Sequence, residues 1–115
     1  METKLALKIY QNAEQDSRFE PDQLNQLKLG INSEVNIVVY ADYRFNAKQM
    51  QEIRLGLERG VVAELYADFE LQAAQMQEIR LGLEHGLDIR PYLNFELTSE
   101  QMQAVRKQLQ AKNLS

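Results

Sequence analysis

Two kinds of side chain in this sequence could perform acid–base chemistry, namely repeated pairs of carboxylates and a single histidine. Glu52 and Glu58 recur as Glu78 and Glu84. Two carboxyl groups act as acid and base in glycoside hydrolysis when a cleft holds them apart and raises the pKa of one. An arginine stands four residues before Glu58 and before Glu84, which is the spacing of an ion pair along a helix. Because an active site is usually built once, the repetition favours a salt-bridged, solvated helix face.

His85 is the only histidine, and we place it in the last turn of a predicted helix, where the helix dipole favours a cation. A zinc site needs several ligands, and the sequence has no second histidine and no cysteine. The segment from Gly56 to Gly60 lacks the lysine of a phosphate-binding loop. We therefore expect a surface role for His85 and predict no metal, no cofactor and no enzymatic activity.

Two columns of residues, each repeating every 26 positions, could contact a partner. A row of bases could bind phosphates or an acidic protein surface, although flanking glutamates neutralise the row and argue against nucleic acid. Repeated tyrosines could form a recognition surface, but a repeated aromatic is more often a core residue with its hydroxyl at the edge. The basic column is Lys28, Arg54, Arg80 and Arg106, and the tyrosine column is Tyr40, Tyr66 and Tyr92. The candidate partner-binding residues are Arg54, Arg80, Arg106, Tyr66 and Tyr92.

These columns belong to a repeated unit of 26 residues. The string Gln-Met-Gln-Glu-Ile-Arg-Leu-Gly-Leu-Glu stands at 49–58 and again, unchanged, at 75–84. The same offset finds a weaker copy on either side. We predict one repeat domain over 1–115, with units near 19–44, 45–70, 71–96 and 97–115.

Apolar residues within each unit follow the i, i+3, i+7 spacing of one helix face. Start signals precede this face, with Pro21 in a first turn and Asn46 and Thr98 at capping positions. Gly60 and Gly86 follow it, where a left-handed residue ends a helix. The three apolar columns are Leu24, Met50, Met76 and Met102; Leu27, Ile53, Ile79 and Val105; and Ile31, Leu57, Leu83 and Leu109. The predicted helices span about 21–33, 47–59, 73–85 and 99–111.

The segments between these helices decide the fold class. The first linker, Val35 to Tyr40, is β-branched and could be a strand, but its register with the later linkers favours a short helix or turn. Residues 1–18 lie outside the repeat register and suit either a strand or a helix, as an N-terminal cap or a degenerate half-unit. We predict an all-α fold, a short α-solenoid-like array of about four helix-plus-short-element repeats, with an α+β fold as the alternative.

A Leu-Gly pair inside each helix calls for an explanation, because a mid-helix glycine costs about 1 kcal/mol relative to alanine. Close approach of a neighbouring element is the usual reason. The pair becomes Lys107-Gln108 in the last copy, which has no successor to cover it. We therefore predict that the pair forms the contact between repeats and that the fourth copy is a C-terminal cap. The pairs are Leu29-Gly30, Leu55-Gly56 and Leu81-Gly82.

Composition excludes several classes of protein. The 115 residues carry a formal net charge of −4, which gives no basic footprint for nucleic acid. No cysteine is present, and no apolar run reaches the roughly 20 residues of a membrane helix. The N-terminus lacks the apolar stretch of a signal peptide. We expect a cytoplasmic protein with no membrane partner.

The repeated motif resembles short tandem repeats in proteins of Gram-positive gut bacteria, their conjugative elements and phages, with the pattern QM-x-EIR-x-GLE-x-G-LDV-x-x-YA. The best matches run from Met50 to Asp68 and from Met76 to Asn94, while Glu34 replaces the glycine of the first copy. The resemblance implies a repeat fold of mobile-element origin and supplies no catalytic residue. We therefore predict a non-enzymatic protein-binding module, in a sharper form an anti-CRISPR-like inhibitor of a host defence nuclease. The alternatives are a nucleic-acid-associated accessory protein and a self-assembling array.

Overall fold

The computed structural model describes residues 1–114, and these form helices and turns with no strand. The all-α prediction is therefore confirmed, and the α+β alternative is wrong. The first linker holds a short 3-10 helix, and the N-terminal segment is an α-helix. The elements are α1 (Thr3–Glu14), α2 (Pro21–Asn32), η1 (Ile37–Val39), α3 (Ala47–Glu58), η2 (Ala63–Leu65), α4 (Ala73–Glu84) and α5 (Ser99–Leu114).

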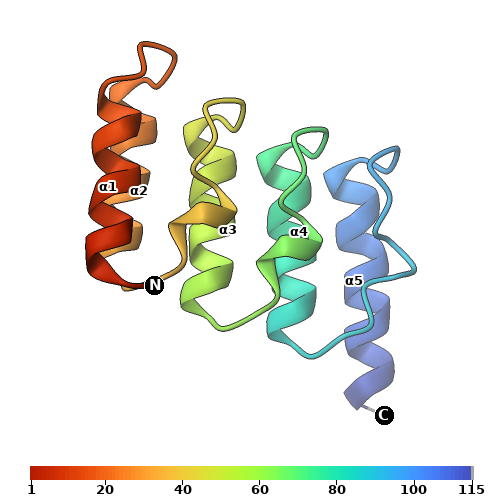
Figure 1. Ribbon diagram of the computed structural model, residues 1–115. Helices are drawn as coiled ribbons and strands as arrows, with labels where there is room; N and C mark the ends of the chain where they lie inside the picture. Colours follow the sequence, from red (N-terminus) through yellow and green to blue (C-terminus); the bar gives the residue numbers. More distant parts are fainter. Residues whose placement is uncertain (115) are drawn as a thin grey trace.

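Helices α2, α3, α4 and α5 lie side by side in chain order and run in the same direction (Figure 1). After each of the first three, a segment that we call a connector returns the chain to the start of the next helix. The connectors, residues 33–46, 59–72 and 85–98, cover one side of the helix row together with α1. The result is an elongated molecule of 50 × 26 × 17 Å with a helix layer and a connector layer.

The predicted start and stop signals act as expected. The Asn46 side chain accepts a hydrogen bond from the Gln49 backbone N–H, and the Gln49 side chain accepts one from the Asn46 N–H in return. Gly60 and Gly86 adopt the left-handed backbone, with φ of 77° and 70°. Glu34 takes the equivalent position after α2 with φ of 61°, a conformation that a residue with a Cβ adopts less readily.

The N-terminal segment enters the repeat register earlier than the sequence analysis placed it. Asp16, Arg18 and Phe19 stand 26 residues before Asp42, Arg44 and Phe45, and both loops close with the same aspartate turn. Helix α1 precedes this first loop and packs on α2 and η1, on the connector side of the molecule. It therefore covers the side of α2 that a connector covers in the later units.

The core lies between the two layers and contains the predicted apolar columns. Met50, Met76 and Met102 are fully buried, as are Leu27, Ile53 and Ile79, whereas the third column is partly buried at the core margin. The tyrosine column is fully buried as well: Tyr40, Tyr66 and Tyr92 each have no exposed surface. The core interpretation of the tyrosines is thus confirmed.

The mid-helix glycines make room for these tyrosines. A Cβ added to Gly56 would lie 1.9 Å from the Tyr66 hydroxyl oxygen, and Gly82 and Tyr92 repeat the arrangement at 1.8 Å. Each tyrosine comes from the connector that follows the same helix. The prediction that the glycine faces the neighbouring repeat is therefore wrong. Leu55 and Leu81 are half-buried, and Lys107 and Gln108 of the last copy are exposed.

No helix among residues 1–114 is both long enough and apolar enough to cross a bilayer.

Candidate interaction surface

The three arginines of the predicted basic column lie within the helix layer and form internal ion pairs. Arg80 donates from Nε to Glu52 on the preceding helix at 2.9 Å, and from Nη1 to Glu84 one turn further along its own helix. Its exposed fraction is 8%. Glu52 and Glu84 more than offset the burial of the guanidinium, so the pKa of Arg80 rises above its ordinary value.

Arg54 and Arg106 repeat this geometry, but each has one glutamine partner in place of a glutamate. Arg54 reaches Gln26 and Glu58, and Arg106 reaches Glu78 and Gln110, all within 2.9 Å. Lys28 instead lies over the ring of Tyr10, 5.5 Å from its centroid. The i,i+4 ion pairs expected for Arg54 and Arg80 are present. Each of these arginines also donates to a side chain 28 positions earlier, on the preceding helix. These arginines join neighbouring helices.

The candidate tyrosines lie equally far from solvent. The Tyr66 hydroxyl donates to the Glu52 carbonyl at 2.7 Å, and the Tyr92 hydroxyl donates to the Glu78 carbonyl at 2.9 Å. Burial raises the pKa of Tyr92 to about 12. Tyr66 and Tyr92 have no exposed surface, Arg80 and Arg106 are each 8% exposed, and Arg54 is half-buried. Partner contact by these residues stays a prediction, and more exposed side chains lie elsewhere on the molecule.

A glutamine column, Gln23, Gln49 and Gln75, connects successive units. The Gln49 amide nitrogen donates to the Leu71 carbonyl at 2.7 Å and to the Phe69 carbonyl at 3.4 Å, both in the next connector. Gln23 and Gln75 each donate in the same way to the backbone carbonyls 20 and 22 residues further along the chain. Gln101, in the last helix, is exposed and caps only its own helix. We call this contact the glutamine clamp.

The carboxylates considered for chemistry are paired with arginines, and the histidine is exposed. Glu58 and Glu84 are bound to arginines, and His85 is exposed at the C-terminal end of α4. Within residues 1–114, no group of three or more His, Cys, Asp or Glu residues could hold a metal ion.

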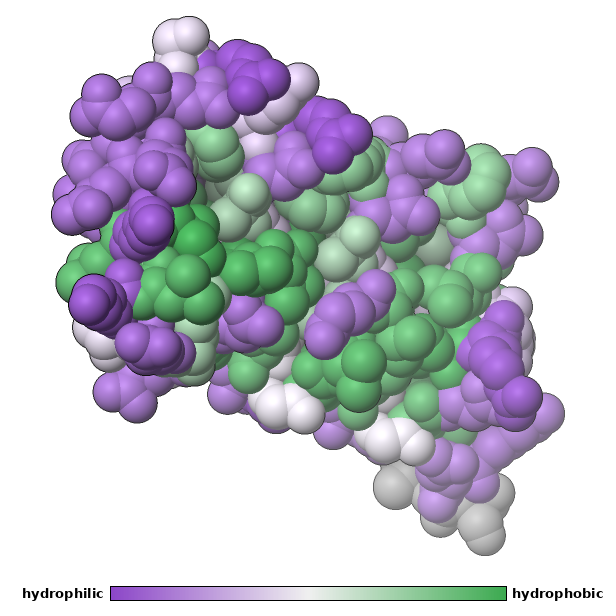
Figure 2. All heavy atoms as spheres, in the orientation of Figure 1, coloured by the Kyte–Doolittle hydropathy of each residue, from purple (hydrophilic) through white to green (hydrophobic). Residues whose placement is uncertain are grey.

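The exposed apolar surface is confined to the connector layer. Among residues 1–113, every exposed large hydrophobic side chain belongs to α1 or to a connector, and α2 to α5 contribute none. Figure 2 shows this face, with green apolar surface extending across it between hydrophilic margins. We call it the connector face. Its exposed apolar residues are Leu5, Leu7, Val38, Tyr43, Val62, Leu65, Phe69, Leu93 and Phe95.

One border of the connector face carries stacked arginine and aromatic side chains. The turns 15–20, 41–46, 67–72 and 93–98 project there, and we call this border the loop edge (Figure 1). Arg18 lies over the ring of Tyr43 with its guanidinium carbon 4.2 Å from the centroid, and Arg44 lies over Phe69 at 4.3 Å.

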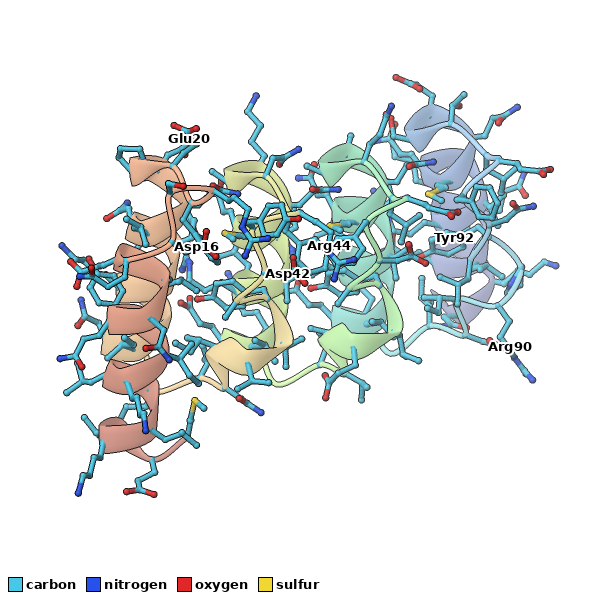
Figure 3. All side chains as sticks on the ribbon, turned by 45° about the horizontal axis from the view of Figure 1, so that its top comes forward. Asp16, Glu20, Asp42, Arg44, Arg90 and Tyr92 are labelled. Atoms are coloured by element: carbon cyan, nitrogen blue, oxygen red, sulfur yellow. The ribbon has the colours of Figure 1, made fainter. Side chains whose placement is uncertain are left out.

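An aspartate of the same turn holds each of these arginines. Arg44 donates from Nε and Nη2 to the two carboxylate oxygens of Asp42 at 3.1 and 2.8 Å, and Figure 3 shows the two side chains together at the loop edge. Asp16 holds Arg18 in the same way, at 2.9 and 2.8 Å. Each arginine thus links the aspartate of its own turn to the aromatic ring of the next.

The Asp16–Arg18 pair gives a direct prediction for titration. The hydrogen bonds from the Arg18 side chain and backbone lower the pKa of Asp16 from 3.8 to about 2. Because the folded-state pKa is depressed, the stabilisation is present above the unfolded value and is lost as the pH falls through about 2. Carboxyl NMR should find the Asp16 midpoint near 2, and Arg18→Gln should move it towards 3.8. Asp88, lowered to about 2 by Arg90, should stay unchanged in that variant; a wild-type Asp16 midpoint near 3.8 would contradict the pairing.

Comparison with known proteins finds no matching family model and no significant match among curated proteins or solved structures.

Proposed function

We propose that the protein is a non-enzymatic protein-binding module and that its connector face binds the partner. The observation that carries this proposal is the one-sided distribution of large exposed apolar side chains, which occupy the connector layer and are absent from α2 to α5 among residues 1–113. Exposed apolar patches bordered by polar residues mark interaction sites in many proteins. Stacked units also provide an extended surface of the kind that repeat proteins use for binding.

The internal ion pairs favour this function over the nucleic-acid alternative. That alternative depended on a free row of basic side chains, but Arg54, Arg80 and Arg106 bind glutamate or glutamine partners between the helices. The acidic net charge also opposes approach to phosphates. A narrower form of the proposal, an inhibitor of a host defence nuclease of mobile-element origin, is supported by the small size, the acidity and the resemblance of the repeats.

A pair of matched variants tests the connector face. Val62→Asn with Leu65→Gln makes two exposed connector positions polar, and Gln51→Ala with Gln77→Ala changes two exposed positions of the helix layer. Each protein serves as bait in extracts of the organism that encodes it. Wild type and the helix-layer variant should capture the same proteins, and the connector variant should lose them by at least about tenfold, a loss of roughly 1.4 kcal/mol in affinity.

Identical capture by all three baits would contradict the proposal. Sedimentation of wild type at high concentration distinguishes the self-assembling array. If wild type forms an oligomer and the connector variant is a monomer, the partner is a second copy of the chain. If wild type is a monomer, self-assembly is excluded. A nuclease subunit in the captured set would support the narrower form.

A further inference from the structure

Three aspartates of the loop edge each stand 27 residues before an aromatic residue of the next turn, and we call each such pair of positions a cation niche. The first is formed by Asp16 and Tyr43, the second by Asp42 and Phe69. In both, an arginine of the chain itself forms a two-bond pair with the aspartate and stacks on the ring. These two niches show in atomic detail which group the arrangement accepts.

The third niche has Asp68 and Phe95 at the corresponding positions of the sequence but lacks the guanidinium. Asp68 accepts a hydrogen bond from the Glu70 backbone N–H at 2.9 Å, which is the bond that Asp42 accepts from Arg44. The side chain that would stack on the ring is a glutamate at position 70 instead of an arginine. Phe95 is the most exposed of the three aromatic residues, at 56% against 37% for Tyr43 and 41% for Phe69.

The charge of the third niche is complementary to the missing group. The aspartate–arginine pairs make the first two niches neutral, whereas Asp68 and Glu70 give the third two negative charges. Glu70, Phe95 and Glu100 line a hollow of about 400 Å³ together with Glu96. Among residues 1–114, no basic side chain forms an ion pair with these glutamates.

We infer that the third niche binds an arginine side chain of the protein partner. The guest guanidinium stacks on Phe95 as Arg44 stacks on Phe69, and it donates to the Asp68 carboxylate as Arg44 donates to Asp42. The Glu70 carboxylate lies beside it as an additional acceptor. This inference rests on the proposed protein-binding function and names the chemistry by which the partner is recognised at one end of the loop edge.

Arginine suits this niche better than lysine for geometric reasons. A guanidinium is planar, so it can stack on a ring while its edge forms two parallel bonds to a carboxylate. A lysine ammonium is a compact, strongly hydrated charge that matches only the electrostatic part of the niche. A stacked cation contributes most where water is partly excluded, as between two adjacent turns.

The test uses three blocked pentapeptides, Gly-Gly-X-Gly-Gly, in which X is arginine, lysine or citrulline. Citrulline has the planar shape of arginine without its charge. Titration into the full-length protein, followed by amide NMR, should give millimolar binding of the arginine peptide with shifts centred on Asp68, Glu70 and Phe95. The lysine peptide should bind at least threefold more weakly, and the citrulline peptide should give no saturable shift.

Two variants use the internal templates as matched controls. Glu70→Arg supplies the third niche with a guanidinium from the chain itself and should abolish binding of the arginine peptide. Arg44→Glu empties the second niche and should create a second binding site centred on Asp42 and Phe69. Equal binding of the arginine and lysine peptides, or binding unchanged by Glu70→Arg, would overturn the inference.

The outcomes separate this inference from the proposed function. If the connector variant loses a captured protein but the arginine peptide does not bind, the niche is rejected and the proposed function stands. If the arginine peptide binds at the third niche but capture does not depend on the connector face, the niche stands and the proposed role of the connector face is rejected.

Discussion

Gly56→Ala should lower the free energy of unfolding by about 2 kcal/mol, although alanine is intrinsically the better helix former by about 1 kcal/mol. The new Cβ would lie 1.9 Å from the Tyr66 hydroxyl oxygen and 3.1 Å from the carbon that carries it. Tyr66 is fully buried and its hydroxyl is bonded to the Glu52 carbonyl, so the ring cannot withdraw without breaking that bond or disturbing the core. Urea denaturation followed by circular dichroism measures the loss.

A second substitution identifies the hydroxyl as the cause. Tyr66→Phe removes the atom nearest to the added Cβ, so Gly56→Ala should cost much less in that background, with a coupling of at least about 1 kcal/mol. Gln51→Ala, at an exposed position of the same helix, should change stability by less than about 0.5 kcal/mol. Equal costs of Gly56→Ala in the two backgrounds would show that the tyrosine does not require the glycine.

Gln49→Glu should destabilise the protein by about 3 kcal/mol, even though the two side chains have nearly the same shape. The carboxylate can still accept the bond from the Asn46 N–H, and its charge suits a helix N-terminus. It cannot donate to the Leu71 and Phe69 carbonyls, and it places a negative charge against both of them. The variant therefore removes the glutamine clamp while it keeps the cap.

Gln101→Glu is the matched control for the clamp. Gln101 caps α5 through the Thr98 N–H, as Gln49 caps α3, but it is exposed and makes no clamp bond. We expect its substitution to change stability by less than about 0.5 kcal/mol. Similar losses in the two variants, measured by the same denaturation experiment, would show that the cap rather than the clamp sets the cost.

The helices could be predicted from sequence because their signals are local. The apolar spacing, Pro21, Asn46 and the glycines after α3 and α4 each act within a few residues, and the helix positions agree with the structure. The state of residues 1–18 could not be decided from the sequence, which suits a strand as well as a helix. Leu5 and Leu7 alternate as in a strand, but both side chains are exposed in α1, so the alternation reflects no buried face.

The tertiary partners were harder to predict because each depends on how far a side chain reaches. Gly56 was expected to face the next repeat, but the tyrosine of its own connector fills the space. Arg80 was expected at the surface, yet Glu52, 28 residues earlier, lies within reach on the adjacent helix. Nothing in the local sequence shows which helix face meets the preceding one.

The candidate surface was missed for a different reason. Tyr43, Phe69 and Phe95 share the 26-residue spacing, so the column was visible in sequence, but spacing alone does not separate a buried aromatic from an exposed one. The fully buried Tyr66 and the 41% exposed Phe69 are only three residues apart. The glutamate at position 70, where the two earlier turns have arginine, was equally visible in the sequence. Its significance follows only from the structure, in which Arg18 and Arg44 occupy the first two niches.

The contacts between units have a direction and a fixed reach, with consequences for how the chain can change in length. Glutamine clamps reach forward by 20 and 22 residues, and arginines reach back by 28. Inserting or removing 26 residues in the middle of the row replaces each partner by its counterpart and leaves no donor or acceptor without one. An insertion whose length is not a multiple of 26 would misplace the partners of every contact that spans it. Duplication of whole units therefore preserves these contacts, and two of the units share an identical segment at 49–58 and 75–84.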